Sequence, residues 1–210
     1  MAQAAGVDIV PQRPGWAAFD FDGTLVPGDS LLPFLTRVLG PGGLARLVAA
    51  AGVQTVQQYR VAGRDGAKAE LLQRALTGRP AADLVDEGRR YAERLVRRVR
   101  PHMAERLRWH RASGHHLVLV SASLDLYLRP LAAALRFDDI IATSMEVGPD
   151  GHLTGRIDGA NVRGPEKARR LRQVIGDAPV ELWAYGDTVG DREMLAMADH
   201  PLLVRRRTPR

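Results

Sequence analysis

The stretch that decides the fold is Trp16-Ala-Ala-Phe-Asp-Phe-Asp-Gly-Thr-Leu25, a short apolar run that ends in two aspartates and a glycine. Its apolar residues are typical of a buried parallel strand. Alternate residues of a strand point to the same face, so we expect Asp20 and Asp22 to project together where the strand gives way to a loop. A solvated strand end followed by an Asp-Gly turn would have the same sequence. The stretch alone leaves both interpretations open.

Two carboxylates that lie close together need a metal ion, hydrogen bonds or a retained proton to offset their repulsion. Each of these arrangements supports chemistry, because one carboxylate can act as a nucleophile while its neighbour carries a proton. If Asp20 and Asp22 form a reaction centre, other parts of the chain must supply the remaining groups.

The composition indicates a globular protein of 210 residues, with one core or a core and a smaller inserted domain. Hydrophobic residues make up 45% and charged residues 26%, which argues against disorder. The absence of cysteine excludes disulfides, thiolate nucleophiles and cysteine metal sites. We expect no signal peptide and no transmembrane helix, because the N-terminus lacks a basic region before an apolar core and charges interrupt the apolar segment 31–56. A cytoplasmic protein is the resulting expectation.

Positive charge is concentrated at the C-terminus. The net charge is +6, and four of the positive charges belong to Arg205, Arg206, Arg207 and Arg210. Short terminal charge runs are usually solvated, so we interpret this segment as a solvated tail and expect no nucleic-acid partner. Aromatic residues are only 5% of the chain, which also argues against nucleic-acid recognition.

Hydrophobic spacing places a helical block between two parts of an alternating strand and helix pattern. Helical spacing covers residues 27–100, whereas strand-like runs at 117–120 and 180–185 alternate with helical segments. Such alternation implies a parallel sheet between two layers of helices. We therefore predict an α/β three-layer sandwich formed by residues 1–26 and 101–210, with an all-helical insertion between them. The insertion follows the two aspartates, so it would lie at the carboxyl edge of the sheet, where open parallel sheets bind ligands.

Three further motifs at strand ends or helix starts suit a phosphate or a metal. Ser121 follows a predicted strand and offers a hydroxyl near free backbone amides, which suits an anion. Lys167 is one of only two lysines among 30 basic residues, and it stands near a helix start, where a cation gains nothing from the helix dipole. Asp187 and Asp191 flank a glycine-containing turn, and Asp187 could join Asp20 in an oxygen-ligand site for Mg²⁺.

Each of these motifs also has an ordinary structural explanation. Ser121 can cap a helix, Asp187 and Asp191 can form a turn and a cap, and a lone lysine can arise by chance. The four motifs occur together at the ends of predicted elements, however, and no single structural reason accounts for all of them.

With these motifs the chain resembles the haloacid dehalogenase superfamily of aspartate-nucleophile phosphatases. Asp20-Phe-Asp-Gly-Thr-Leu25 is similar to the first motif of that superfamily, Ser121 to its second, Lys167 to its third and Gly186-Asp-Thr-Val-Gly-Asp191 to its fourth. The helical insertion after the first motif is similar to the phosphoserine phosphatase-like branch, subfamily IB. The resemblance covers nearly all of residues 16–204, and it implies a Rossmann-like fold with a helical cap domain.

The resemblance implies catalytic and metal-binding roles in a Mg²⁺-dependent phosphatase. Asp20 would attack phosphorus and form an aspartyl-phosphate, while Asp22 would protonate the leaving oxygen and later activate water. The presence of Asp22 favours a phosphatase over a dehalogenase, which does not need that acid. The metal would be held by Asp20, the backbone carbonyl of Asp22, and Asp187. Asp191 would orient Lys167 or a water ligand of the metal.

The resemblance also implies which residues bind the phosphate, but it does not extend to the substrate contacts of the insertion. The residues implied to bind the phosphate are Ser121, Ala122 and Lys167. The candidates for contacting the rest of the substrate from the insertion are Asp29, Arg60 and Lys68. Solvated helix positions explain the last three residues about equally well.

These observations predict the hydrolysis of a small phosphorylated metabolite. Alternatives are phosphoserine phosphatase proper, a lipid-headgroup phosphatase and a phosphotransferase. An alternative of another class is a phosphate-binding regulatory protein that acts through the cap or the basic tail. The residues that favour the enzyme are Asp20, Asp22, Lys167 and Asp187.

Overall fold

The computed structural model of the protein describes residues 13–204, with residue 48, residues 50–62 and residue 64 described through their backbone only. Residues 1–12 and 205–210 lie outside this part, and with them the Arg-rich tail. Within residues 13–204, no helix combines the length and the apolar composition that are needed to cross a bilayer.

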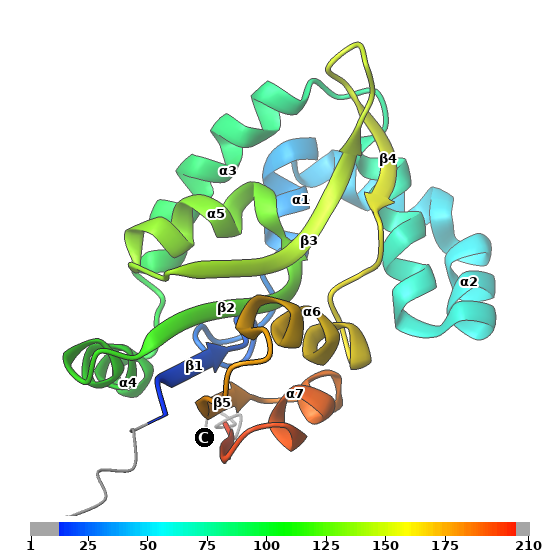
Figure 1. Ribbon diagram of the computed structural model, residues 1–210. Coiled ribbons are helices and arrows are strands. Elements are labelled where there is room, and N and C mark those ends of the chain that lie inside the picture. Colours follow the sequence, from blue (N-terminus) through cyan, green and yellow to red (C-terminus); the bar gives the residue numbers. More distant parts are fainter. Residues whose placement is uncertain (1–12, 205–210) are drawn as a thin grey trace, which may run out of the picture.

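A six-stranded sheet forms the centre of the molecule, in the order β4-β3-β2-β1-β5-β6 (Figure 1). The strands are β1 (Gly15–Phe19), β2 (His116–Leu124), β3 (Asp139–Val147), β4 (Leu153–Asp158), β5 (Glu181–Gly186) and β6 (His200–Leu203). Neighbouring strands are parallel, except that β3 and β4 form an antiparallel hairpin. The expected α/β fold is therefore confirmed, with a sheet that is mostly parallel.

Helices cover both faces of the sheet. The helices of the described part are α1 (Leu31–Leu39), α2 (Pro41–Leu76), α3 (Ala81–Val96), α4 (Pro101–Ala112), α5 (Asp125–Ala134), α6 (Pro165–Ile175) and α7 (Arg192–Ala196), with a 3₁₀ turn at Val189–Asp191. The helices that cover the faces of the sheet are α4 and α5 on one side and α6 and α7 on the other. Alternation along β1 directs Ala18 toward the layer of α6 and α7, whereas Ala17 and Phe19 face the layer of α4 and α5. A strand that is buried on both faces needs apolar residues throughout, which explains the apolar run before Asp20.

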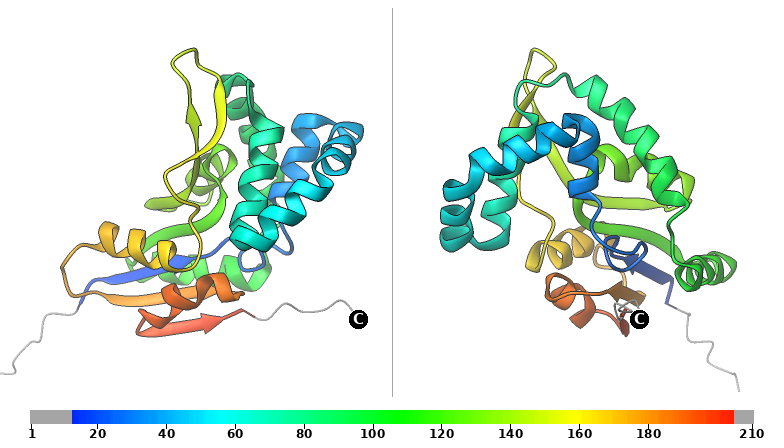
Figure 2. Two further views of the ribbon diagram at one scale, coloured as in Figure 1. Left: turned by 90° about the vertical axis from the view of Figure 1, so that its right-hand side faces the viewer. Right: turned by 180° about the vertical axis from the view of Figure 1, so that it is seen from behind.

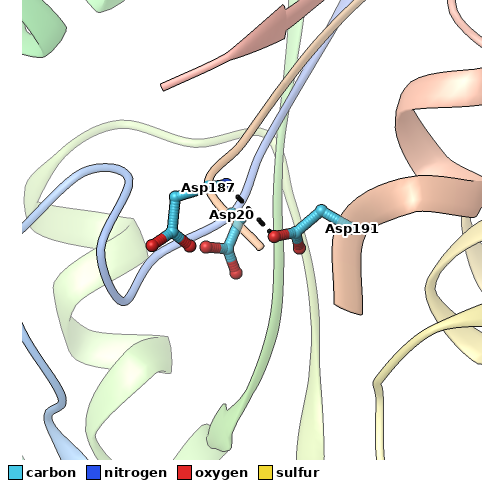
Figure 3. Close-up of side chains that lie close together, drawn as sticks. All are labelled: Asp20, Asp187 and Asp191. Atoms are coloured by element: carbon cyan, nitrogen blue, oxygen red, sulfur yellow. Dashed lines mark hydrogen bonds between the residues drawn. The ribbon is translucent and has the colours of Figure 1, made fainter. Parts of the chain in front are cut away.

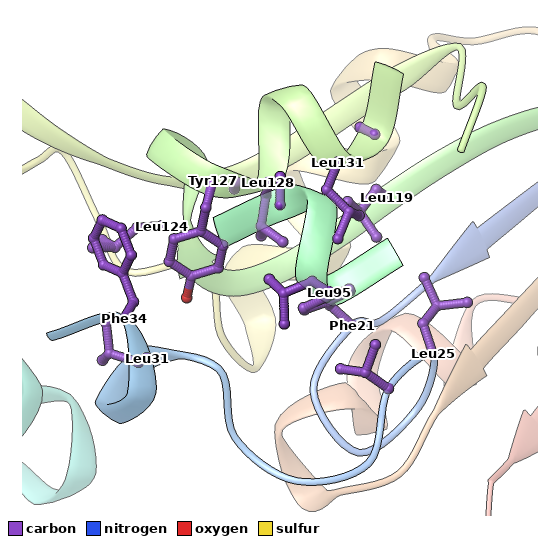
Figure 4. Packing of buried hydrophobic residues seen from close by; sticks show 14 of the residues in the cluster. Phe21, Leu25, Leu31, Phe34, Leu95, Leu119, Leu124, Tyr127, Leu128 and Leu131 are labelled. Carbon is purple, nitrogen blue, oxygen red and sulfur yellow. The ribbon is translucent and has the colours of Figure 1, made fainter. Parts of the chain in front are cut away.

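The inserted helices α1 to α3 share one hydrophobic cluster with the layer of α4 and α5. Phe34 of α1, Leu95 of α3 and Leu128 of α5 belong to this cluster, together with Phe21 from the turn after β1 (Figure 4). Figure 2 shows α1 to α3 and the β3–β4 hairpin at the same end of the molecule. The Gly78 amide donates to the carbonyl of Leu153 (2.8 Å), which ties the end of α2 to that hairpin.

Two elements differ from the sequence prediction. The strand predicted to end at Val120 continues to Leu124 as β2, although its pairing with β3 shifts between these two residues. The irregular stretch between them contains Ser121. Helix α2 lies within the predicted helical block, but it is broken by non-helical backbone at Gly63 (φ 62°, ψ −151°), a left-handed conformation that glycine adopts without steric strain.

Candidate active site

The first strand-end motif forms a tight turn after β1. The amide of Asp20 donates to the carbonyl of Tyr185 on β5 (2.9 Å), and the amide of Gly23 donates to the carbonyl of Val26 (2.9 Å). Gly23 has φ 85°, and a Cβ atom at this position would lie 2.0 Å from Oδ2 of Asp187. Glycine is therefore required both for the conformation of the turn and for the close approach of Asp187.

Lys167 of α6 joins two of the carboxylates. Its Nζ donates to Oδ1 of Asp20 (2.5 Å) and to Oδ1 of Asp191 (2.6 Å), and the residue is only 3% exposed. Burial alone would lower the pKa of Lys167, but the two carboxylates outweigh burial and raise this pKa above its usual value. Lys167 therefore stays charged between Asp20 and Asp191.

Asp20 is buried and held through both of its oxygens. Thr24 donates its hydroxyl to Oδ2 (3.0 Å), while Lys167 occupies Oδ1. Burial raises the pKa of Asp20 to about 6, and the Lys167 ammonium opposes this shift. The Lys167 ammonium on Oδ1 favours the ionised form of this carboxyl, and an ionised carboxylate can act as a nucleophile.

Asp191 closes the loop that follows β5. Its Oδ2 accepts a hydrogen bond from the amide of Asp187 (3.2 Å; Figure 3). The same oxygen accepts hydrogen bonds from the amide and hydroxyl of Thr188 (both 3.0 Å). Burial would raise the pKa of Asp191, but the charge of Lys167 lowers it below its usual value. With Lys167 on Oδ1, Asp191 accepts four hydrogen bonds, which is about the capacity of one carboxylate.

The residues Asp20, Asp187 and Asp191 form an acidic cluster that suits a metal ion. One carboxylate oxygen from each lies within 4.8 Å of the other two (Figure 3). Carboxylate oxygens are the ligands that Mg²⁺ prefers, usually from one or two side chains with water completing the shell. Because the acceptor capacity of Asp191 is already used within the protein, Asp20 and Asp187 fit better as direct ligands. The donor set is therefore compatible with Mg²⁺.

Asp22 has a separate environment. Ser30 and Ser123 both donate to its Oδ2, over 2.9 Å and 2.5 Å. Burial raises the pKa of Asp22 to about 7, although the Ser123 bond works against this shift, and the negative charge of Asp29 contributes to it. A carboxyl group with a pKa near 7 can both donate and accept a proton at neutral pH.

The second motif lies in the irregular part of β2. Ser121 is buried, and its Oγ accepts a hydrogen bond from the amide of Ser123 (3.1 Å). The carbonyl of Ala122 accepts a hydrogen bond from the ammonium of Lys68, which belongs to α2. This segment therefore contacts the inserted helices through Ala122.

Lys68 ties α2 to the loop between β4 and α6. Its Nζ also donates to Oδ1 of Asn161 (2.5 Å), which accepts from the hydroxyl of Thr143 as well (3.0 Å). The amide group of Asn161 donates to Asp65 of α2 (2.8 Å). Burial lowers the pKa of Lys68 to about 8, and the negative charges of Asp65 and Asp22 oppose this shift.

The other two residues predicted to contact the substrate are Asp29 and Arg60. Asp29 is exposed, and its Oδ1 accepts a hydrogen bond from the amide of Leu32 (3.0 Å) at the start of α1, which is a capping contact. The side chain of Arg60 lies outside the part of the chain whose side chains are described. Of the two candidates whose side chains the structure describes, Lys68 is therefore the one whose contacts reach the strand-end motifs.

Several residues at the site were missed by sequence reasoning. Ser123 is not among the predicted site residues, although the alternation used for Asp20 and Asp22 would also direct Ser121 and Ser123 to one face. Ser30 and Asn161 carry no local signal, because their partners are distant in the sequence.

Comparison with known proteins agrees with this geometry. The model of the haloacid dehalogenase-like hydrolase family matches residues 17–196, which include all four motifs. Protein CicA of Caulobacter vibrioides is 38% identical over 191 residues, covering 89% of this chain and 84% of CicA. Phosphoserine phosphatase SerB2 of Mycobacterium tuberculosis is 31% identical over 186 residues, covering 86% of this chain but 41% of SerB2.

A similar fold is found in a solved structure, a protein of unknown function from Bordetella pertussis Tohama I. It has 25% sequence identity and a TM-score of 0.72, and the match covers 88% of this chain and 87% of that one. The sequence match and the similar fold extend over most of the chain. The protein therefore belongs to the haloacid dehalogenase-like hydrolase family.

Proposed function

We propose that the protein is a Mg²⁺-dependent phosphatase that hydrolyses a small-molecule phosphomonoester through an aspartyl-phosphate on Asp20. The observation that carries this proposal is a buried carboxylate held by Lys167 and Thr24, with an oxygen of Asp187 close enough to share a metal ion. Membership of a hydrolase family supports hydrolysis, and the similarity to SerB2 supports a phosphate ester as the substrate.

The first step is phosphoryl transfer to the protein. An oxygen of Asp20 bonds to phosphorus while the bond between phosphorus and the ester oxygen breaks. Protonated Asp22 donates its proton to that oxygen, so the alcohol leaves as a neutral molecule.

The second step regenerates the protein. The Asp22 carboxylate takes a proton from a water molecule, and the oxygen of that water attacks the phosphorus of the aspartyl-phosphate. The bond between phosphorus and Asp20 breaks, inorganic phosphate leaves, and Asp22 is protonated again. A pKa of about 7 at Asp22 suits both directions of proton transfer.

Charge neutralisation is the other requirement of phosphoryl transfer. In our proposal Ser121, Ala122 and Lys167 bind phosphoryl oxygens, and Asp191 keeps Lys167 in place. Asp20, the backbone carbonyl of Asp22, and Asp187 would hold Mg²⁺, which when bound supplies positive charge beside the phosphoryl group.

In our proposal the helical cap formed by residues 27–100 selects the substrate. Lys68 supports this assignment, because it is a cation of the inserted helices that contacts Ala122 beside the proposed phosphate site. O-phosphoserine is a candidate substrate on the strength of the similarity to SerB2. A cytoplasmic location stays a prediction.

The experiment is an assay of phosphate release from a panel of phosphate esters with and without Mg²⁺, including O-phosphoserine and p-nitrophenyl phosphate. We expect metal-dependent turnover of at least one ester, and a loss on the order of 10⁴-fold or more in Asp20→Asn. Asp177→Asn is the matched control, because Asp177 is exposed and takes no part in the site.

Absence of metal-dependent turnover on every ester would contradict the enzyme and favour a phosphate-binding regulatory protein. Addition of acceptor alcohols separates a phosphotransferase, which would transfer the phosphoryl group to the alcohol in preference to water.

A further inference from the structure

The two oxygens of Asp22 have different surroundings. Oδ2 accepts hydrogen bonds from the hydroxyls of Ser123 (2.5 Å) and Ser30 (2.9 Å). Oδ1 is buried and has no hydrogen-bond partner among the residues that the structure describes. A buried carboxyl oxygen without a partner is unfavourable unless a proton or a ligand satisfies it.

The position of Ser30 is fixed by contacts with two tyrosine hydroxyls. It is completely buried, its Oγ lies 3.0 Å from the hydroxyl oxygen of Tyr127, and its carbonyl accepts a hydrogen bond from the hydroxyl of Tyr91 (3.0 Å). A serine hydroxyl has one proton, and that of Ser30 is donated to Asp22, so Tyr127 must donate to Ser30. The hydrogen bonds therefore run from Tyr127 to Ser30 and on to Asp22.

Packing fixes the position of Tyr127, the first donor in this chain of hydrogen bonds. It lies within the hydrophobic cluster and its ring packs against Phe34, with 4.9 Å between the ring centroids (Figure 4). Burial raises the pKa of Tyr127 well above its usual value, so the hydroxyl keeps its proton. Because Tyr127 is fully buried, Ser30 has little freedom to move away from Asp22.

We propose that Ser123 and Ser30 are positioning residues that hold Oδ2 of Asp22 and so assign proton transfer to Oδ1. Two hydroxyl donors stabilise an oxygen that carries no proton, which leaves Oδ1 as the protonated oxygen of the acid form. The same two bonds, from β2 and from the residue before α1, oppose rotation of the carboxyl group. This role rests on the phosphatase activity proposed above.

Leaving-group dependence distinguishes positioning from general structural support. An alkyl phosphate needs a proton on its departing oxygen, whereas p-nitrophenolate leaves readily without one. The kcat/KM value reports the steps up to the first irreversible one, so it measures this first proton transfer and excludes the later attack of water. Loss of positioning should therefore lower kcat/KM for the alkyl ester selectively.

The test compares Ser123→Ala with the wild type on p-nitrophenyl phosphate and on O-phosphoserine, or on another alkyl phosphate from the panel if the wild type prefers it. We expect kcat/KM for the alkyl ester to fall about 30-fold and that for p-nitrophenyl phosphate to fall less than about 3-fold. Ser123→Thr keeps the hydroxyl and should recover most of the loss. Ser144→Ala is the matched control, because the Ser144 hydroxyl donates to Asp125 (2.9 Å) and should leave both values unchanged.

Two results would overturn the positioning role: equal losses on both esters, or no loss on either ester. Ser30→Ala repeats the measurement from the other donor, and thermal unfolding of both variants checks that they are folded. If Ser30→Ala does not fold, Ser123→Ala still decides the outcome.

Asp22→Asn separates this role from the proposed function. If it lacks the selective loss on the alkyl ester, Asp22 is not the acid, and the proposed mechanism fails with the positioning role. If it shows that loss while Ser123→Ala and Ser30→Ala do not, the positioning role alone is wrong.

Discussion

The strand ends and the inserted helices contribute to the site in different ways. At the strand ends, charged side chains hold one another, with Lys167 between Asp20 and Asp191. The insertion contributes single groups, Ser30 and Lys68, and each of them is held by residues outside it. Asp20 and Lys167 are therefore held without the insertion. In our proposal the insertion contributes to proton transfer through Ser30 and to substrate choice through Lys68. Substitutions of Asp20 and of Lys167 should affect all esters alike, whereas substitutions in the insertion should change the ratio between esters, as should those of Asp22 and Ser123.

The largest effect is expected from Lys167→Met at the strand ends. It leaves two buried carboxylates without their cation, so kcat/KM should fall on the order of 10³-fold for every ester that the wild type hydrolyses. The free energy of unfolding should fall by about 3 kcal/mol, measured by urea denaturation at pH 7.

Arg169→Met on the same helix is the control for this substitution. Arg169 pairs with Glu166 at an exposed position, so its loss should change stability by less than about 0.5 kcal/mol. A decrease in kcat/KM of Lys167→Met that is confined to some esters would contradict the expected difference between the strand ends and the insertion.

A smaller and selective effect is expected from Lys68→Met in the insertion. The substitution removes a positive charge beside Ala122, so kcat/KM for O-phosphoserine, whose leaving group carries a carboxylate, should fall about tenfold. The value for p-nitrophenyl phosphate should stay within about 2-fold of the wild type. Equal losses on the two esters would show that Lys68 acts on the reaction and has no part in selection.

The pH dependence of this selectivity tests the same residue. Burial lowers the pKa of Lys68 to about 8, so the side chain is charged below that pH and neutral above it. The preference for O-phosphoserine over p-nitrophenyl phosphate should therefore decline as the pH rises through about 8. Loss of the Asp22 proton, whose pKa is about 7, lowers this preference in every variant, so the contribution of Lys68 is the part of the decline that is missing in Lys68→Arg, whose guanidinium does not lose its proton there. The same pH profile of the ratio in the wild type and in Lys68→Arg would contradict this account.

The strand-end groups were accessible from the sequence. Parallel strands end at one edge of a sheet, so the residues after β1 and β5 had to lie close together once the alternating pattern was recognised. The structure brings Asp20, Lys167 and Asp187 to that edge, and their chemical roles stay predictions. The fold class followed from the same pattern, because apolar runs and helical spacing are local signals.

The contacts between the insertion and the core could not be predicted in this way. Ser30 and Ser123 are 93 positions apart, as are Lys68 and Asn161. Such pairs depend on how α1 to α3 pack on α5 and on the β3–β4 hairpin, which no short pattern records. The extension of β2 beyond Val120 also depends on residues that are distant in the sequence, because its last residue, Leu124, pairs with Thr143 of β3.

The central claim is that Asp20 becomes phosphorylated during the reaction. In Asp22→Asn the base for the second step is missing, so an aspartyl-phosphate formed from p-nitrophenyl phosphate should accumulate. Acid quenching followed by peptide mass spectrometry would detect it. The account predicts that the peptide containing Asp20 gains the mass of one phosphoryl group, and that Asp20→Asn shows no such gain. Phosphorylation of a different residue, or phosphate release by Asp22→Asn without any modified form of Asp20, would contradict it.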